Sequence, residues 1–420
     1  MIIKSISETI QTVKKSYFEY RSWRYVTKNM MAHLPKGIKK HQGSIPYINK
    51  PGIAFSFDDS FRIEHWYKYG RPIFGYYDVK ATFNINGFHH YEDQRPHTQS
   101  EIDMLLDLQS NGHEIAHHGF NHKSAYKYSK EKGLKKWIED EIISLFKWME
   151  NQSHSKTNEK FKHPVSFALP YSEYENENIS EITPNYFKVV RGHLHKNNFA
   201  NFNCTGFVPS ICIDSVYLSN AKYMNKLMKI AKKTGRNIIF MCHSILPDDV
   251  KWDDFGWEKD DSGVEWWRTS PDTIQKVINH ARKNDMEFYT TAEIAGVATF
   301  IDRNLEKSVR KQLSNPYEKW ISIKELSCIK ELDLSNNSIS NLDGIQYFLN
   351  LEKLNLRNNQ ITDFRLLKKL PKLKEISIDQ NPLTRSEKVA VGSVHNLLIL
   401  LGININLVML TLNNFETTLL

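Results

Sequence analysis

Residues 53–59 read IAFSFDD, a run of apolar and small residues that ends in two aspartates. Three other segments share this short, apolar, β-branched and aromatic character: KATFNIN (80–86), PVSFAL (164–169) and RNIIFMCH (236–243). Such runs predict buried β-strands. Between them lie segments with helical periodicity: SEIDMLLDLQSNG (100–112), LKKWIEDEIISLFKWMEN (134–151) and PDTIQKVINHARKND (271–285). Strands that alternate with helices predict a parallel β/α architecture, either open or closed into a barrel.

A repeat begins at about residue 322. It recurs every 22 residues as ELDLSNNSISNL (331–342), KLNLRNNQITDF (353–364) and EISIDQNPL (375–383). The pattern resembles the L-x-x-L-x-L-x-x-N-x-I motif of leucine-rich repeats. In such repeats each unit supplies one short strand, its leucines fill the core, and the asparagine side chain bonds the turning backbone. The sequence therefore predicts a second, solenoid domain.

Composition and charge place the chain among globular proteins with more than one domain. It has 420 residues, of which 40% are hydrophobic and 25% charged, and this length favours two or three domains. We expect a basic N-terminal extension (1–50), a β/α barrel (51–300), a linker helix (301–321) and a leucine-rich repeat domain with a C-terminal cap (322–420).

The positive charge is concentrated near the start of the chain. The net charge is +8, and residues 1–50 contain ten Lys or Arg residues against Glu8 and Glu19. A basic arm of this kind either contacts an anionic membrane, nucleic acid or glycan, or is a solvated helical extension. No nucleic-acid-binding motif is recognisable, so we expect no nucleic-acid partner.

The N-terminal sequence does not read as a secretory signal, because Lys4, Glu8 and Lys14 interrupt every apolar run. The four cysteines form no C-x-x-C pair, which fits reduced thiols: Cys204, Cys212, Cys242 and Cys328. We therefore expect a cytoplasmic protein whose basic arm holds it peripherally at the inner membrane surface.

Two clusters of residues carry metal chemistry. Asp58 and Asp59 follow the first strand, where β/α barrels place their active sites, although such a pair is also common in solvated turns. His118 and His122, in HEIAHHGFNH (113–122), are spaced so that they could share one helical face and bind one metal ion. The alternative for this segment is a surface helix with scattered histidines.

Asp59 with these two histidines would leave open metal positions for water and substrate. Asp58 could then accept the proton of the water. His113 and His117 are additional candidate ligands. Glu114 is not placed between the spaced histidines, so the segment is no H-E-x-x-H zinc-protease motif.

The order of these motifs resembles the polysaccharide deacetylase (NodB-homology, carbohydrate esterase) family over roughly residues 51–295. The matching segments are IAFSFDD, KATFNI, NGHEIAHHGFNH, FALPYS (167–172) and IIFMCHS (238–244). The resemblance implies a distorted (β/α) barrel, with Asp58 as catalytic base and Asp59, His118 and His122 as metal ligands. It further implies that the backbone N–H of Tyr171 faces the oxyanion and that His243 is the general acid.

The chain departs from the family pattern at two positions. The hydroxyl residue of the family's H-S/T-x-x-H motif is Gly119, and the arginine of its R-x-P-Y motif is Ala168. In the family this arginine orients the base, and some relatives supply it from a later segment. We therefore expect Arg191, in YFKVVRG, to take this role. The alternative is that Arg191 is an ordinary surface or salt-bridged residue. Asp214 is our candidate for the acidic partner of His243.

Four tryptophans follow His243 in a loop rich in Asp and Gly: Trp252, Trp257, Trp266 and Trp267. Aromatic faces of this kind either stack on sugar rings or cover the barrel mouth.

These features predict a metal-dependent hydrolase that removes an N-acetyl group from a carbohydrate, either a polysaccharide or a surface-glycan precursor. The expected cofactor is a divalent metal ion, Zn²⁺ before Co²⁺, Ni²⁺ or Fe²⁺. One alternative is a catalytically degenerate barrel that acts with the repeats as a protein- or glycan-binding module. Another is a deformylase or esterase acting on a lipid-linked or nucleotide sugar.

Overall fold

The computed structural model describes most of the chain between residues 50 and 382. The described residues are 13, 17, 50–89, 94–192, 199–200, 206–215, 221–251, 266–313 and 320–382. The chain divides between Ala295 and Gly296 into two compact units. Almost all of the basic extension expected at 1–50 lies outside the described residues, and so do residues 383–420, where we expect the C-terminal cap. No helix in the described ranges combines the length and apolar character that crossing a bilayer requires.

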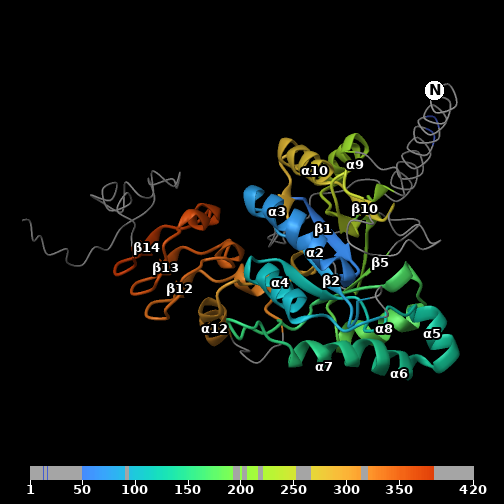
Figure 1. The fold of residues 1–420 in the computed structure, drawn as a ribbon. Coiled ribbons are helices and arrows are strands. Elements are labelled where there is room, and N and C mark those ends of the chain that lie inside the picture. The colour runs from blue at the N-terminus through green and yellow to red at the C-terminus, as the bar shows by residue number, and fades with distance from the viewer. Residues whose placement is uncertain are drawn as a thin grey trace, which may run out of the picture. The chain divides into compact units, whose positions relative to one another are not determined.

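The first unit is built on a nearly closed barrel of parallel strands (Figure 1). Eight strands follow one another in the order β6-β5-β4-β3-β2-β1-β8-β7, and β11 (Glu287–Phe288) also pairs with β1. Their bounds are β1 Gly52–Asp58, β2 Thr82–Ile85, β3 Glu114–His117, β4 Ser166–Ala168, β5 Val189–Gly192, β6 Gly206–Pro209, β7 Ile211–Cys212 and β8 Ile238–Cys242. Of the two predicted forms of the β/α architecture, open or closed, the structure therefore has the barrel.

Helices surround this barrel. Those that connect its strands include α3 (Arg71–Tyr77), α4 (Gln99–Ser110), α5 (Ala125–Lys132), α8 (Asn176–Asn185), α9 (Ala221–Thr234) and α10 (Pro271–Lys283). A long helical stretch comprises α6 (Leu134–Trp137), η3 (Ile138–Ile143) and α7 (Ser144–Asn151). Shorter helices are η1 (Ser60–Arg62), α2 (Ile63–His65), η2 (Trp66–Gly70), η4 (Pro170–Ser172) and α11 (Thr291–Ile294), and β9 (Ser244–Ile245) pairs with β10 (Arg268–Thr269).

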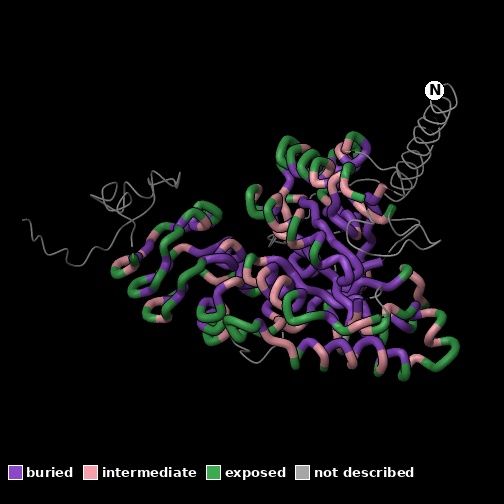
Figure 2. The backbone as a smooth tube through the Cα atoms, in the orientation of Figure 1, coloured by how far each residue is buried: buried purple, intermediate pink, exposed green. Residues whose placement is uncertain are grey.

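Burial on both faces explains why the strands read as continuous apolar runs. All seven residues of β1 are buried, as are all five of β8, and parallel strands covered on both sides are apolar throughout. Figure 2 shows this buried interior enclosed by helices that expose their outer faces. Such a scaffold holds its strand ends rigidly, which a catalytic site requires.

The second unit contains the leucine-rich repeats. Its strands β12 (Glu331–Asp333), β13 (Lys353–Asn355) and β14 (Glu375–Ser377) pair in parallel, with Leu332 opposite Leu354 and Leu354 opposite Ile376. The predicted 22-residue register is thereby confirmed. Asn359 is buried, and its Nδ2 donates to the carbonyls of Leu334 and Leu356 at 2.9 Å, which is the bonding expected of the repeat asparagine.

Helix α12 (Arg303–Gln312), in the segment expected as a linker, packs within this second unit. The Asp302 side chain caps it by accepting from the amides of Asn304 and Leu305. The other oxygen of Asp302 accepts from the amide and hydroxyl of Ser340 in the first repeat. The capping residue thus fixes the helix to the solenoid.

Candidate active site

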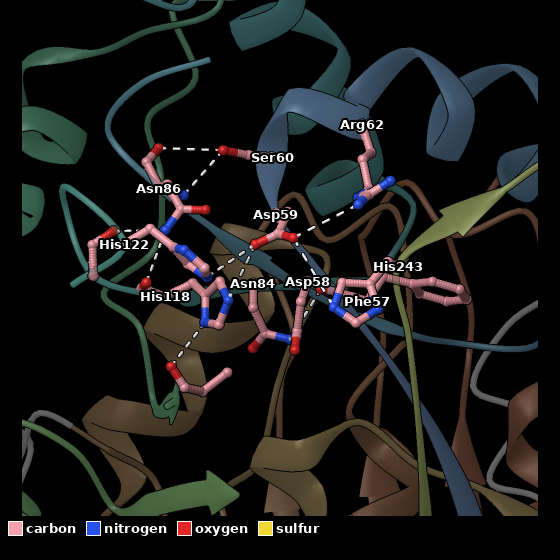
Figure 3. Close-up of polar contacts among 12 residues, drawn as sticks. Phe57, Asp58, Asp59, Ser60, Arg62, Asn84, Asn86, His118, His122 and His243 are labelled. Carbon is pink, nitrogen blue, oxygen red and sulfur yellow. Dashed lines mark hydrogen bonds and ion pairs between the residues drawn. The ribbon is translucent and has the colours of Figure 1, made fainter. Parts of the chain in front are cut away.

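The ends of several barrel strands bring the candidate residues together (Figure 3). Asp58 is the last residue of β1, and Asp59 follows it. His118 follows β3, and His243 follows β8. Because these strands are parallel, their carboxyl ends lie at one edge of the barrel, where β/α barrels place reactive groups. Figure 3 shows these four side chains and His122 turned toward a common space.

Asp58 is buried and held by two side chains, one from β2 and one from β5. Arg191 Nη2 donates to Asp58 Oδ1 and Oδ2 at 2.5 and 2.6 Å. Asn84 Nδ2 donates to Asp58 Oδ1 at 2.8 Å. The structure therefore places Arg191 on the carboxylate that the missing motif arginine would contact.

Strand register explains how Arg191 reaches this place. Ala168 in β4 lies opposite Arg191 in β5. An arginine at position 191 can therefore enter the same site as an arginine at position 168. Arg191 Nη1 also donates to Ser210 Oγ at 3.1 Å. The guanidinium is 1% exposed, and a buried ion pair needs such additional hydrogen bonds to be favourable.

Asp59, His118 and His122 form a candidate metal-binding group. Asp59 Oδ1 lies 3.4 Å from His118 Nε2 and 3.2 Å from His122 Nε2. This oxygen is buried and makes no hydrogen bond to the described residues. Two atoms that each bind a tetrahedral Zn²⁺ at about 2.0–2.1 Å are about 3.3–3.4 Å apart. The three residues therefore fit one metal ion.

Hydrogen bonding and charge prepare these groups for a cation. His118 Nδ1 donates to the Ala168 carbonyl at 2.8 Å, which leaves the lone pair of Nε2 directed at Asp59 Oδ1. Burial lowers the pKa of His118, but Asp58 and Asp59 outweigh it, so the net shift is upward. Burial raises the pKa of Asp59, yet His122, His118 and His243 hold it well below its usual range.

The expectation that His118 and His122 share a helical face is wrong. Residues 114–117 are strand β3, and α5 begins only at Ala125. Gly119 and His122 have φ of 79° and 54°, values that an α-helix does not contain. The two imidazoles therefore meet through a turn of the β3–α5 loop rather than through helical periodicity.

This loop is fixed by two polar side chains from outside it. Asn86 Nδ2 donates to the carbonyls of His118 and Gly119 at 2.8 and 2.9 Å. The buried Glu141 carboxylate accepts from the amides of Asn121 and Lys123. Neither Asn86 nor Glu141 was singled out from the sequence, because their partners are backbone groups far away along the chain.

His243 is paired with Asp214, as the sequence suggested. Its Nδ1 lies 2.5 Å from Asp214 Oδ2, and its amide donates to Asp214 Oδ1 at 3.1 Å. Asp214 is fully buried. His243 Nε2 faces the metal-binding group, 3.9 Å from Asp59 Oδ2. The carboxylate fixes Nδ1 as the protonated nitrogen and leaves Nε2 for proton transfer.

Tyr171 lies at the rim of the site. Its ring is 4.6 Å from that of His122, and the residue is 66% exposed. Its φ is 58° and that of Asp59 is 71°. Non-glycine residues in this region carry strain of about 1–3 kcal/mol and cluster at functional sites. Asp59, His122 and Tyr171 all adopt it.

The remaining sequence candidates divide between core and rim. His113 accepts from the Ala81 amide, and His117 contacts the Ile142 carbonyl and the Gly119 amide. Both are buried and lie outside the candidate metal-binding group, so they are structural. Trp267 packs on His243 at 4.8 Å, and Trp266 is 58% exposed. Trp252 and Trp257 lie outside the described residues.

Comparisons with known proteins agree with this architecture. The family model described as "Polysaccharide deacetylase" matches residues 48–187, and "Leucine Rich repeats (2 copies)" matches residues 349–389. Centrosomal protein of 72 kDa from Mus musculus is 41% identical over 70 residues, which is 16% of this chain and 11% of that protein. The chain thus spans only a small part of this curated relative.

Two kinds of solved structure are similar to the chain. Peptidoglycan deacetylase PdaC from Bacillus subtilis is 17% identical, with 64% of this chain and all of that chain covered and a TM-score of 0.35. An internalin (inlF) from Listeria monocytogenes is 32% identical, with 23% of this chain and 28% of that chain covered and a TM-score of 0.20. The two family models, rather than these structures, identify a polysaccharide deacetylase domain at residues 48–187 followed by leucine-rich repeats at 349–389.

Proposed function

We propose that this chain is a metal-dependent hydrolase that removes an N-acetyl group from a carbohydrate. The observation that carries the proposal is that Asp58, held by Arg191, and His243, held by Asp214, lie in one site with Asp59. Asp59, His118 and His122 would hold the metal ion, Zn²⁺ before Co²⁺, Ni²⁺ or Fe²⁺. Such an ion polarises the acyl carbonyl and makes water easier to deprotonate.

The protein's own groups supply the proton transfers. Asp58 accepts a proton from the attacking water, while Arg191 and Asn84 hold its carboxylate in place. The Tyr171 backbone N–H donates to the oxyanion that develops on the acyl oxygen. His243 Nε2 donates a proton to the departing amine, and Asp214 stabilises the imidazolium before that transfer.

The Arg191–Asp58 contact weighs against the alternative of a degenerate barrel that only binds glycans or proteins. Ala168 suggested that the base had lost its orienting partner, but Arg191 contacts both oxygens of Asp58. We propose a cytoplasmic enzyme that acts on a polysaccharide or surface-glycan precursor, with the repeats binding a protein partner. We also propose that residues 1–50 contact an anionic membrane. A lipid-linked or nucleotide sugar that carries an acyl group other than acetyl is the alternative substrate.

The test combines elemental analysis of the purified protein with acetate release from N-acetylated oligosaccharides and nucleotide sugars. We expect one equivalent of a divalent metal ion and measurable turnover. Asp58→Asn should keep the metal and lose about 10²–10⁴-fold in turnover, the usual contribution of a general base. Asp107→Asn, which alters a carboxylate that accepts from the Tyr67 hydroxyl, is the matched control. A fully active Asp58→Asn variant would exclude the assigned base, and a metal-free, inert wild type would favour the binding module.

A further inference from the structure

Arg62 is an arginine that the proposed chemistry does not use. It lies at the end of η1, three residues after Asp59, and is 1% exposed. Arginine is almost never fully buried unless it is paired, and removing it from water carries a desolvation cost of several kcal/mol. A buried guanidinium beside a candidate metal group therefore needs an explanation.

The guanidinium joins two segments of the site. Its Nη1 donates to Ser244 Oγ at 2.5 Å, and its Nη2 lies 3.8 Å from Asp59 Oδ2. Ser244 is itself buried and directly follows His243. The Arg62 amide also donates to the Asp59 carbonyl at 3.1 Å. Arg62 thus contacts the Asp59 turn through both backbone and side chain and ties it to the segment that carries His243.

The two oxygens of Asp59 face different groups. Oδ1 faces His118 and His122 at 3.4 and 3.2 Å. Oδ2 faces Arg62 at 3.8 Å and His243 at 3.9 Å. Figure 3 shows the Arg62 side chain approaching the Asp59 carboxylate from the side away from His118 and His122. This division suits a carboxylate that binds a metal through Oδ1 alone.

We propose that Arg62 is a positioning residue for the metal ligand Asp59. It holds Oδ2 so that Oδ1 points at the two imidazoles, and through Ser244 it fixes the Asp59 turn relative to His243. The inference rests on the proposed function, because it assumes that Asp59, His118 and His122 bind the metal ion.

Charge and geometry make opposite contributions here. The positive charge of Arg62 repels a bound cation, so removing the charge would by itself tighten metal binding. The planar guanidinium, by contrast, keeps Nη2 facing Oδ2 while Ser244 holds Nη1. Losing an outer-shell partner of a ligand typically weakens metal affinity 10–100-fold. Lysine retains the charge without the planar guanidinium. Arg62→Lys therefore isolates the geometric contribution.

The experiment is titration of the full-length, metal-free protein with Co²⁺, followed by the visible absorption of the bound ion. We expect Arg62→Lys to bind Co²⁺ about tenfold more weakly than wild type and with an altered spectrum. Ser244→Ala removes only the anchor of Nη1, so it should fold and show a smaller loss in the same direction. Arg71→Lys is the matched control, since Arg71 donates to the Tyr67 hydroxyl and should leave Co²⁺ binding unchanged.

Unchanged Co²⁺ affinity in Arg62→Lys would overturn the positioning role, and so would tighter binding. If Arg62→Lys does not fold, unchanged affinity in Ser244→Ala has the same consequence. Wild-type protein that binds no Co²⁺ would instead contradict the proposed metal group itself. The wild-type titration thus separates failure of the proposed function from failure of this inference.

Discussion

Individual residues at the site adopt conformations that the rest of the fold must impose. Asp59, His122 and Tyr171 have positive φ without being glycine. Their neighbours hold them there: the Arg62 amide donates to the Asp59 carbonyl, and Glu141 accepts from the amides on both sides of His122. Strain of this kind persists only where surrounding contacts over-determine it.

The conformation of Gly119 explains why glycine replaces the hydroxyl residue of the family's H-S/T-x-x-H motif. Its φ is 79°, and a Cβ there would lie 2.7 Å from Glu141 Oε2. We expect Gly119→Ser, which restores the family's hydroxyl residue, to destabilise the loop and weaken Co²⁺ binding. Gly133→Ser is the control, because Gly133 has φ of 94° and open space around the added atom. Both variants carry backbone strain of about 1–3 kcal/mol, and only Gly119→Ser adds the collision.

Chemical denaturation and Co²⁺ titration measure the two effects. A Gly119→Ser variant that is no less stable than Gly133→Ser, with full metal affinity, would show that Glu141 yields to the new side chain.

His113 makes stability depend on pH. Burial, followed by Lys80 and Arg71, lowers its pKa from 6.5 to about 3, so the folded state keeps it neutral while the unfolded chain takes up a proton below 6.5. Stability from this residue is therefore complete above pH 6.5 and is lost as the pH falls toward 3. Between pH 7 and 5 the loss is about 2 kcal/mol.

Urea unfolding of wild type and His113→Asn at pH 7 and pH 5 measures this contribution. The asparagine can still accept from the Ala81 amide, so the stability difference between the two proteins should narrow by about 2 kcal/mol at pH 5. A constant difference would mean that His113 does not titrate between the folded and unfolded states.

At the scale of elements, strand register decides which side chains share the site. Ala168 and Arg191 are opposite each other on β4 and β5. A guanidinium from either position is therefore expected to reach Asp58, although only the one from β5 is present.

This equivalence predicts that the arginine can be moved between the two strands. Arg191→Ala leaves the buried Asp58 without its ion partner and should cost about 3–5 kcal/mol of stability, with a large loss of turnover. The double variant Arg191→Ala/Ala168→Arg should recover part of both. Stability from urea unfolding and acetate release provide the measurements, and the single variant Arg191→Ala is the reference for the recovery. If the double variant recovers neither stability nor turnover, strand register alone does not determine where an arginine can contact Asp58.

In the whole molecule, the chain forms two compact units, and among the described residues the candidate metal group lies in the first. Metal at about a hundred times its dissociation constant should add about 2.7 kcal/mol to the stability of the unit that binds it. Calorimetry should therefore show Co²⁺ raising the unfolding temperature of the first unit and not that of the repeats. His122→Gln should abolish this shift, and an equal shift in both transitions would contradict the assignment.

Local patterns in the sequence were enough to predict the elements with strong periodicity. The four apolar runs became β1, β2, β4 and β8, and the 22-residue repeat became β12 to β14 in the expected register. Both follow from local patterns of burial, which a sequence displays directly. The short strand β3 was missed because its four residues lie within a histidine-rich segment whose i, i+4 spacing imitates a helix.

The meeting of the reactive groups, by contrast, depends on how distant segments fold together. Asp58 and Arg191 are 133 residues apart along the chain, and Asp214 and His243 are 29 apart. Contacts of this kind depend on strand order and register, which the linear pattern does not encode. The buried position of Arg62, and the placement of His118 and His122 on a loop held by Asn86 and Glu141, are likewise products of packing between distant segments.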